Sequence, residues 1–425
     1  MPGFAYRARI EEGISVKTSE LNEEIKRLAA ELEPYIIACR HKLHTIPEAS
    51  SREFQTKAFL IEEIRRCGLP YEEVPTNSLI VRLETGRPGM TVALRADMDG
   101  LPVNESAENL TGPRVCRSEH EGYCHACGHD AHMAMMLGAM RVLTQLQDQL
   151  CGTVLFCFEE GEEAVTGLAA LLEALEKYHV DRCWAIHVYA GLDEGKLSVE
   201  AGPRMSGVSV TAVNFRGKGG HGSRPDMARN PVFAGAAFLN NLSMAFGQQV
   251  TAGETVTLGI TLFRSGSALN VIEDIAELGG SLRFFNQEEG QRAVERFCRI
   301  AEHTAAMFDC AVEYPRGVPK VLGSPAINDP EASALALRVL PEVLPDGTLS
   351  GCEPWYASET FSGWLQKYPG VLAFLGIRNE SEGFGALHQN EKFDLNDKVL
   401  KTDVLATVRY AAAFLAQQED AGTAN

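Results

Sequence analysis

The chain has 425 residues, 45% of them hydrophobic and 23% charged, with a formal net charge of -18 and a pI near 5.1. This size predicts two to three domains of a globular protein with sizeable cores. The acidic balance argues against a nucleic-acid partner and against an anionic membrane surface, because both call for a basic face.

The first half of the chain alternates predicted helices and buried strands. Residues 20–46 carry apolar side chains at helical spacing, and 90–96 (MTVALRA) form a short apolar run typical of a buried strand. A helix is expected to begin near His132, followed by a strand at 153–158 (TVLFCF), a short helix and a strand at 183–188 (CWAIHV). This order predicts an α/β fold with a mostly parallel sheet.

The pattern changes after Gly202, where apolar and polar residues alternate more regularly. The segments VSVTAVNFRG, TVTLGITLF and IAELGGSLRFF are typical of strands, and two helical segments lie among them. After PRGVPK the helix–strand alternation of the first half returns. We predict a discontinuous α/β domain formed by 1–204 and 319–425, with a smaller α+β domain inserted at 205–318.

Several segments carry residues that can bind metal or move protons. The stretch CHACGHDAH (124–132) is rich in cysteine and histidine, while ADMDG (96–100) and EEGEEA (159–164) each follow a predicted buried strand. Open α/β sheets place their active sites at such strand ends. His187 lies inside an apolar strand, and His388 follows the apolar run VLAFLGI. Because metal ligands converge from separate parts of a chain, we favour a catalytic metal site.

Each of these features also has a simpler interpretation. CHACGHDAH with Cys116 could form a structural zinc knuckle, although a second ligand pair at matching spacing is missing from the sequence. A glutamate-rich loop is often a solvated surface, and a lone histidine such as His187 is often a satisfied core residue. Glu162 and Glu163 are adjacent, so we expect their side chains to diverge, one binding metal and the other acting as general base.

The order of the motifs resembles the M20 metallopeptidases, and most closely their amidohydrolase branch. RHKLHTIPEAS, ADMDGLP, CHACGHDAHMAMMLGA, the glutamate pair after a strand, AIHV, GKGGHGSRP and LHQNEKFDL follow one another as in that family. The branch includes hippurate hydrolases, N-acyl-amino-acid amidohydrolases and plant auxin-conjugate hydrolases. The resemblance covers nearly the whole chain and implies a catalytic α/β domain that carries a smaller lid or dimerisation domain.

The resemblance also implies a set of site residues. Two divalent metal ions would be held by five ligands: Cys127, His129, Glu163, His187 and His388. The Cys127 thiolate would be shared between the ions, and Glu162 would be the general base. Asp99, and Asp97 close to it, would orient the ligands.

Three residues of the inserted domain complete the implied site. His221 in GGHG would stabilise the oxyanion, reaching the site of a partner subunit. Asn270 in LNVIED and Arg283 in SLRFF would contact the oxyanion or the carboxylate of the substrate. A homodimer or higher homo-oligomer follows if His221 acts across an interface.

The implied function is hydrolysis of the amide bond of N-acyl amino acids or related conjugates, by a metal-activated water with Glu162 as base. Zinc suits thiolate and imidazole ligands, while the carboxylates also admit manganese or cobalt. The expected partner is a small-molecule substrate. Alternatives are a dipeptidase or aminopeptidase of the same family, or a non-catalytic amide-binding dimer. Retention of Glu162 with all five ligands favours the enzyme.

Three segments depart from the usual pattern of the family. Residues 159–161 are Glu-Glu-Gly where Gln-Pro-Ala is common, Asp226 stands where histidine often follows the proline, and 358–361 is Ser-Glu-Thr-Phe rather than Ser-Glu-Asp-Phe. None of these changes removes an implied ligand, so they bear on substrate choice.

The cysteines and apolar runs bear on the compartment. The 11 cysteines are odd in number and scattered, which does not suit a disulfide framework. The first residues have no apolar core of signal-peptide length, and no apolar run approaches the roughly 18 residues of a spanning helix. We therefore expect a cytoplasmic protein.

Overall fold

The computed structural model describes residues 2–422, with side chains described from Thr18 to Gln417. The chain forms two compact units. Unit 1 comprises Met1–Gly202, Asn328–Cys352 and Trp364–Asn425, and unit 2 comprises Pro203–Ile327 and Glu353–Gly363. The outermost residues of the predicted first domain, Met1 and 423–425, lie outside the described residues.

Unit 2 is longer than the predicted insertion at 205–318, and it takes in a segment from later in the chain. Met205 and Trp355 form a parallel bridge, and Ser206 N–H donates to the carbonyl oxygens of Trp355 and Ala357. This backbone pairing attaches Glu353–Gly363 to unit 2. It joins residues far apart in sequence, so local sequence patterns did not indicate it.

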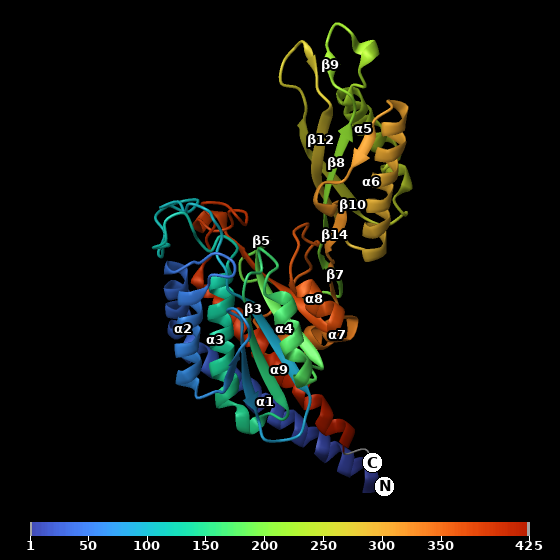
Figure 1. Cartoon of the computed structure of the whole chain (residues 1–425). Helices are drawn as coiled ribbons and strands as arrows, with labels where there is room; N and C mark the ends of the chain where they lie inside the picture. Colours follow the sequence, from blue (N-terminus) through green and yellow to red (C-terminus); the bar gives the residue numbers. More distant parts are fainter. Residues whose placement is uncertain (1, 423–425) are drawn as a thin grey trace. The chain divides into compact units, whose positions relative to one another are not determined.

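Unit 1 contains a mixed sheet with the strand order β1-β2-β4-β3-β5-β16-β6 (Figure 1). Its strands are β1 (Tyr71–Glu73), β2 (Leu79–Glu84), β3 (Thr91–Asp97), β4 (Thr153–Glu159), β5 (Arg182–Asp193), β6 (Leu197–Ser198) and β16 (Gly370–Arg378). The central strands β4, β3, β5 and β16 pair in parallel, and the edge pairings are antiparallel. The predicted α/β class is confirmed, with its parallel part at the centre of the sheet.

Helices cover this sheet. Three of them, α1 (Pro2–Thr45), α3 (His129–Gln145) and α9 (Leu400–Gly422), pack against one another, and α3 and α9 also contact β3 (Figure 1). Unit 1 also contains α2 (Phe54–Cys67), α4 (Leu168–Leu175) and α7 (Pro330–Val339). The short helix α8 (Phe361–Lys367) begins in unit 2 and ends in unit 1. Among the helices of the described residues, none combines the length and the apolar character needed to cross a bilayer.

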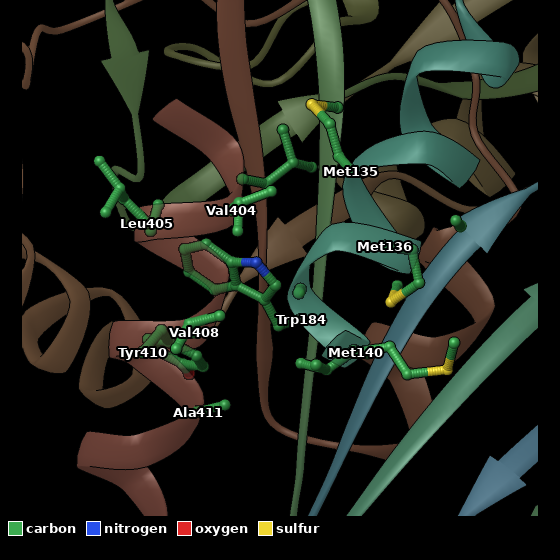
Figure 2. Packing of buried hydrophobic residues seen from close by; sticks show 14 of the residues in the cluster. Met135, Met136, Met140, Trp184, Val404, Leu405, Val408, Tyr410 and Ala411 are labelled. Carbon is green, nitrogen blue, oxygen red and sulfur yellow. The ribbon is translucent and has the colours of Figure 1, made fainter. Parts of the chain in front are cut away.

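The core of unit 1 is built around Trp184 of β5, which is only 1% exposed. Its indole stacks on Tyr410 with ring centroids 4.2 Å apart, and its Nε1 donates to Thr407 Oγ1 at 2.9 Å. Figure 2 shows α9 residues on one side of the indole and three α3 methionines on the other, Met135, Met136 and Met140. This packing fixes α3 and β5 against each other, and both elements carry predicted site residues.

Unit 2 is built on an antiparallel sheet in the order β10-β12-β8-β13, with β14 also paired to β8. Its strands are β8 (Gly207–Arg216), β10 (Val256–Arg264), β12 (Ile275–Phe284), β13 (Ala311–Glu313) and β14 (Lys320–Gly323). Helices α5 (Pro231–Ala245) and α6 (Gln287–Met307) pack together and against β8 and β12 (Figure 1). Two small pairs complete the unit: β9 (Gly220–His221) with β11 (Val271–Ile272), and β7 (Gly202–Met205) with β15 (Ala326–Asn328).

Candidate metal centre

Cys127 and His129 are brought together by the glycine between them. Gly128 has a φ of +91°, and a Cβ at this position would lie 2.3 Å from Val188 Cγ2, so only glycine fits. The helix α3 begins at His129, not near His132 as predicted. The left-handed glycine ends the loop one residue before His129, and a count of apolar positions does not detect such a turn.

The first turn of α3 is anchored to α1 by a buried ion cluster. Asp130 Oδ2 accepts hydrogen bonds from Arg40 Nε at 3.0 Å and from His44 Nδ1 at 2.8 Å. Burial opposes the charge of this carboxylate, but Arg40 and His44 outweigh it and hold the pKa of Asp130 well below its usual range. Asp130 therefore fixes the start of the helix that carries His129.

Two further histidines approach Cys127 from other parts of the sheet. His187 of β5 places Nε2 3.6 Å from Cys127 Sγ, and His388, in the loop after β16, places Nδ1 3.8 Å from the same atom. His187 Nδ1 donates to the carbonyl of Val188 at 2.6 Å, which turns Nε2 towards Cys127. His388 differs, because Ala190 N–H donates to its Nε2 at 3.1 Å. Its Nδ1 then carries the ring proton, so His388 would have to release Ala190 to bind a cation.

Burial favours the neutral forms of Cys127 and His388. It raises the pKa of the Cys127 thiol well above that of an exposed cysteine. Burial, together with the neighbouring His187, lowers the pKa of His388. A thiol in such surroundings becomes a thiolate only beside a positive charge, such as a divalent cation.

The ring of His129 lies among carboxylates. Its Nδ1 donates to the backbone oxygen of Asp99 at 2.8 Å, and its Nε2 lies 3.7 Å from Asp97 Oδ2. Among the described residues, this buried Nε2 has no hydrogen-bond partner. Burial disfavours a charged ring, but Asp97 and Asp99 outweigh it and raise the pKa of His129 well above its usual range. The surroundings of Nε2 therefore favour positive charge.

The turn that follows β4 presents Glu162 and Glu163. Their backbone N–H groups donate to the two carboxylate oxygens of Asp99, each at 3.1 Å. A carboxylate oxygen from each lies within 4.8 Å of a His129 nitrogen and of the other, so the expectation that the two side chains diverge is wrong. Adjacent side chains diverge in extended backbone, but these residues lie in a turn after Gly161, which has a φ of +61°.

Glu163 is partly exposed, but one of its two carboxylate oxygens is buried. Its Oε2 accepts from Gln389 Nε2 at 3.2 Å, while its buried Oε1 has no hydrogen-bond partner within the described part of the chain. Burial raises the pKa of Glu163, and the nearby Asp99 carboxylate adds to this effect. A cation at Oε1 would satisfy this oxygen and favour its ionised form.

The structure thus gathers the implied ligands and the base at one end of the unit 1 sheet. Potential ligand atoms of Cys127, His129 and His187 lie within 4.8 Å of one another, and so do those of His129, Glu162 and Glu163. Two overlapping donor groups suit a pair of adjacent cations. His129 Nε2 and Glu163 Oε1, which lack a hydrogen-bond partner within the described residues, are the kind of buried atoms that a bound metal satisfies.

The structural knuckle interpretation lacks support. Cys116 and Cys124 belong to none of the metal-binding groups found among the described residues. The Cys116 thiol donates to the backbone oxygen of His41 at 3.3 Å, and neither Cys116 nor Cys124 is in a disulfide. Of the two cysteines of CHACGHDAH, Cys127 belongs to such a group and Cys124 does not.

The three remaining predicted residues belong to unit 2. His221 of β9 pairs with Val271 of β11, and Gly222 N–H donates to the backbone oxygen of Asn270 at 2.8 Å, so His221 and Asn270 are close neighbours. Arg283 is at the other end of β12 from Ile275, which follows shortly after β11. At about 3.3 Å per residue, Ile275 and Arg283 are roughly 25 Å apart. One copy of unit 2 does not bring Arg283 to His221 and Asn270.

Two supporting residues were absent from the predicted site. Ser50 Oγ donates to Asp99 Oδ2 at 2.6 Å, and Gln389 contacts Glu163. Both lie within segments that carry the family resemblance, RHKLHTIPEAS and LHQNEKFDL. Their position in those segments was the available signal. Serine and glutamine are not common metal ligands, so their side-chain chemistry did not point to the site.

Comparisons with known proteins agree with this geometry. The family model for peptidase family M20/M25/M40 matches residues 93–413. Thermostable carboxypeptidase 2 of Saccharolobus solfataricus is 32% identical over 402 residues, which cover 93% of this chain and 99% of that protein. The N-acyl-L-amino acid amidohydrolase of Geobacillus stearothermophilus is 36% identical over 267 residues, covering 62% of this chain and 71% of that protein.

A solved structure gives the same result at the level of the fold. The Bacillus subtilis YXEP protein, a dinuclear metal binding peptidase from the M20 family, superposes with a TM-score of 0.78. The two chains are 25% identical, and the match covers 91% of this chain and 99% of that one.

Proposed function

Because the chain belongs to peptidase family M20/M25/M40, we propose that this metal-dependent hydrolase cleaves the amide bond of N-acyl amino acids or related amino-acid conjugates. The observation that carries the proposal is the convergence of thiol, imidazole and carboxylate donors around His129, whose buried Nε2 has no hydrogen-bond partner among the described residues. The likeness to an N-acyl-L-amino acid amidohydrolase supports the substrate class.

Two divalent ions would be held by Cys127, His129, Glu163, His187 and His388. When bound, such a pair polarises the amide carbonyl and lowers the pKa of a coordinated water. Zinc is the first choice for a thiolate and imidazoles, and manganese or cobalt are the alternatives. The likeness to a dinuclear metal binding peptidase supports the number of ions.

Glu162 acts as the general base. Its peptide N–H is held by Asp99, and its carboxylate lies beside that of Glu163 without being needed as a ligand. The carboxylate takes a proton from the attacking water, the water oxygen bonds to the amide carbon, and the proton passes to the leaving nitrogen as the C–N bond breaks. Asp99 acts as a support that fixes the peptides of both glutamates and the ring of His129.

Unit 2 supplies substrate contacts and the dimer interface. Arg283 is half-buried, and its NH1 has no hydrogen-bond partner among the described residues, which suits a carboxylate of the substrate. His221 and Asn270, which lie beyond the end of β12 opposite to Arg283, would stabilise the oxyanion in the site of a second copy. The exposed edge strand β10 carries Leu262 and Phe263 at 37% and 40% exposure, which supports a dimer formed along this edge.

A second candidate is removal of the C-terminal residue from short N-blocked peptides. The 32% identity to a thermostable carboxypeptidase favours it. The chemistry is the same, since an N-acyl amino acid and such a peptide share an amide nitrogen next to a free carboxylate. We further propose a cytoplasmic location, because cysteines that form no disulfide and a thiolate ligand suit a reducing compartment.

The test combines metal analysis with a substrate series. The full chain, purified without chelator, should contain about two metal ions. Removing them should abolish hydrolysis of N-acetyl, N-benzoyl and longer N-acyl amino acids, and Zn²⁺, Mn²⁺ or Co²⁺ should restore it. The ranking of kcat/KM then identifies the acyl group, and N-blocked dipeptides separate the second candidate from the first. Full activity without metal would refute the proposal.

A further inference from the structure

The strand β5 loses one of its neighbours before it reaches the metal centre. The pairing of β3 with β5 ends at Arg95↔Ala185, whereas β5 continues through His187 and Val188. On its other side, β5 is still paired with β16 at these two residues. Val188 is fully buried, so its peptide groups need partners on the side where β3 has ended.

Two imidazoles take the place of the missing strand. Val188 N–H donates to His132 Nε2 at 3.0 Å, and the Val188 carbonyl accepts from His187 Nδ1 at 2.6 Å. His132 Nδ1 in turn donates to Asp97 Oδ1 at 2.7 Å, and Arg95 donates to Asp97 Oδ2 at 2.7 Å. A continuous series of contacts therefore runs from Arg95 through Asp97, His132 and Val188 to His187.

The ring of His132 is not available as a metal ligand. Asp97, His129 and His132 are close enough to form a three-residue metal group. However, the lone pair of Nε2 accepts the Val188 N–H and is not available to a cation. Nδ1 carries the ring proton, which it donates in the hydrogen bond to Asp97. The contacts of His132 are those of a support.

We propose that His132 is a positioning residue of the metal centre: it holds the backbone of Val188 through the N–H, and the carbonyl of the same residue orients His187 so that Nε2 faces Cys127. The inference rests on the proposed metal site. A metal-binding histidine is commonly oriented by a backbone carbonyl at its second nitrogen, and losing such support typically weakens metal binding 10- to 100-fold, to order of magnitude. Here the carbonyl belongs to Val188, the residue whose N–H a second imidazole holds in place.

Three substitutions separate the two contacts of His132. His132→Gln keeps an acceptor near the position of Nε2, His132→Asn keeps a donor to Asp97 but not the acceptor, and His132→Phe keeps the ring and removes both. A cavity of about 10 Å³ lies beside His132 and has room for about one water. Alanine would enlarge this cavity, and a water there could replace the lost acceptor, so phenylalanine is the better substitution.

The readout is the affinity of the metal-free full chain for Zn²⁺, measured by competition with a chelating dye. We expect His132→Phe and His132→Asn to bind at least about tenfold more weakly than the unsubstituted chain, and His132→Gln to stay within about threefold. Met136→Leu, which lines the same cavity, is the matched control for packing and should bind Zn²⁺ normally.

The outcomes separate this inference from the proposed function. Unchanged affinity in His132→Phe would overturn the role of His132, and so would a loss in His132→Gln as large as that in His132→Phe. A purely structural role predicts lower unfolding temperatures of the metal-free variants with Zn²⁺ affinity unchanged, which is also a negative result. An unsubstituted chain that takes up no Zn²⁺ would instead refute the metal site itself.

Discussion

Glu162 is the site residue whose chemistry can be separated from metal binding. Glutamine at this position has nearly the same shape and keeps the peptide N–H that donates to Asp99, but its amide cannot accept a proton at neutral pH. We expect Glu162→Gln to lose at least about 100-fold in kcat, with metal content and unfolding temperature unchanged. Steady-state kinetics and elemental analysis on the same preparation measure both quantities.

The neighbouring carboxylate offers a matched control. Glu163 lies in the same turn and is held by the same Asp99 carboxylate. Glu163→Gln should lose metal and activity together, because its buried Oε1 is a proposed ligand atom. If Glu162→Gln also lost its metal, or if it kept full turnover, the division of roles between the two glutamates would be wrong.

At the scale of elements, His44 joins α1 to the first turn of α3. It donates to Asp130 Oδ2 at 2.8 Å and to Glu105 Oε1 at 2.7 Å. Burial, and to a smaller extent Arg40, opposes its charge, but the two carboxylates outweigh them and raise the pKa of His44 to about 9. The unfolded value is near 6.5, so the protonated ring stabilises the fold fully below about pH 6.5 and this contribution is lost as pH rises through about 9.

The corresponding variant is His44→Gln. Its deficit in the free energy of unfolding relative to the unsubstituted chain should be on the order of 3 kcal/mol near pH 6, at about 1.4 kcal/mol per pKa unit, and should shrink towards pH 10. Urea unfolding of both proteins at each pH measures this difference, and effects common to both proteins cancel. A deficit that does not change with pH would show that the charge of His44 does not hold the two helices together.

The elements themselves differ in how well the sequence predicts them. The strands β3, β4 and β5 were predicted because each is a continuous apolar run, as strands buried on both faces are. The antiparallel edge pairing of β2 with β4 was not, because neighbours in a sheet are chosen by tertiary packing. The left-handed conformation of Gly128 and the turn at Glu162 were also not predicted. The residue types allow these backbone conformations but do not require them.

The candidate site shows the same division. That Cys127, His129 and His187 lie close together could be predicted, because motif order carries these residues. Their relative directions could not, because these come from single contacts such as Val188 with His187 and Asp99 with the peptides of Glu162 and Glu163. The Asp99 contacts join segments far apart in the chain, and the Val188 contact depends on the local rotamer of His187, so neither leaves a periodic trace in the sequence.

At the scale of the whole molecule, the length of the unit 2 sheet bears on assembly. His221 and Asn270 lie beyond one end of β12 and Arg283 lies near the other, roughly 25 Å away at about 3.3 Å per residue. A small substrate cannot reach both ends of one copy. In the proposed symmetric dimer, each copy would supply Arg283 to one site and His221 to the other, which removes this difficulty.

Mixing two inactive variants tests this arrangement directly. His221→Ala should be inactive because the oxyanion loses a donor, and Glu162→Gln because the site loses its base. In a mixed dimer, the site of the His221→Ala chain keeps Glu162 and receives His221 from the other chain. A 1:1 mixture after subunit exchange should therefore recover about one quarter of normal activity per chain, since half of the dimers are mixed and each has one complete site. Differently tagged chains that co-purify without recovering activity would show that His221 acts within its own subunit.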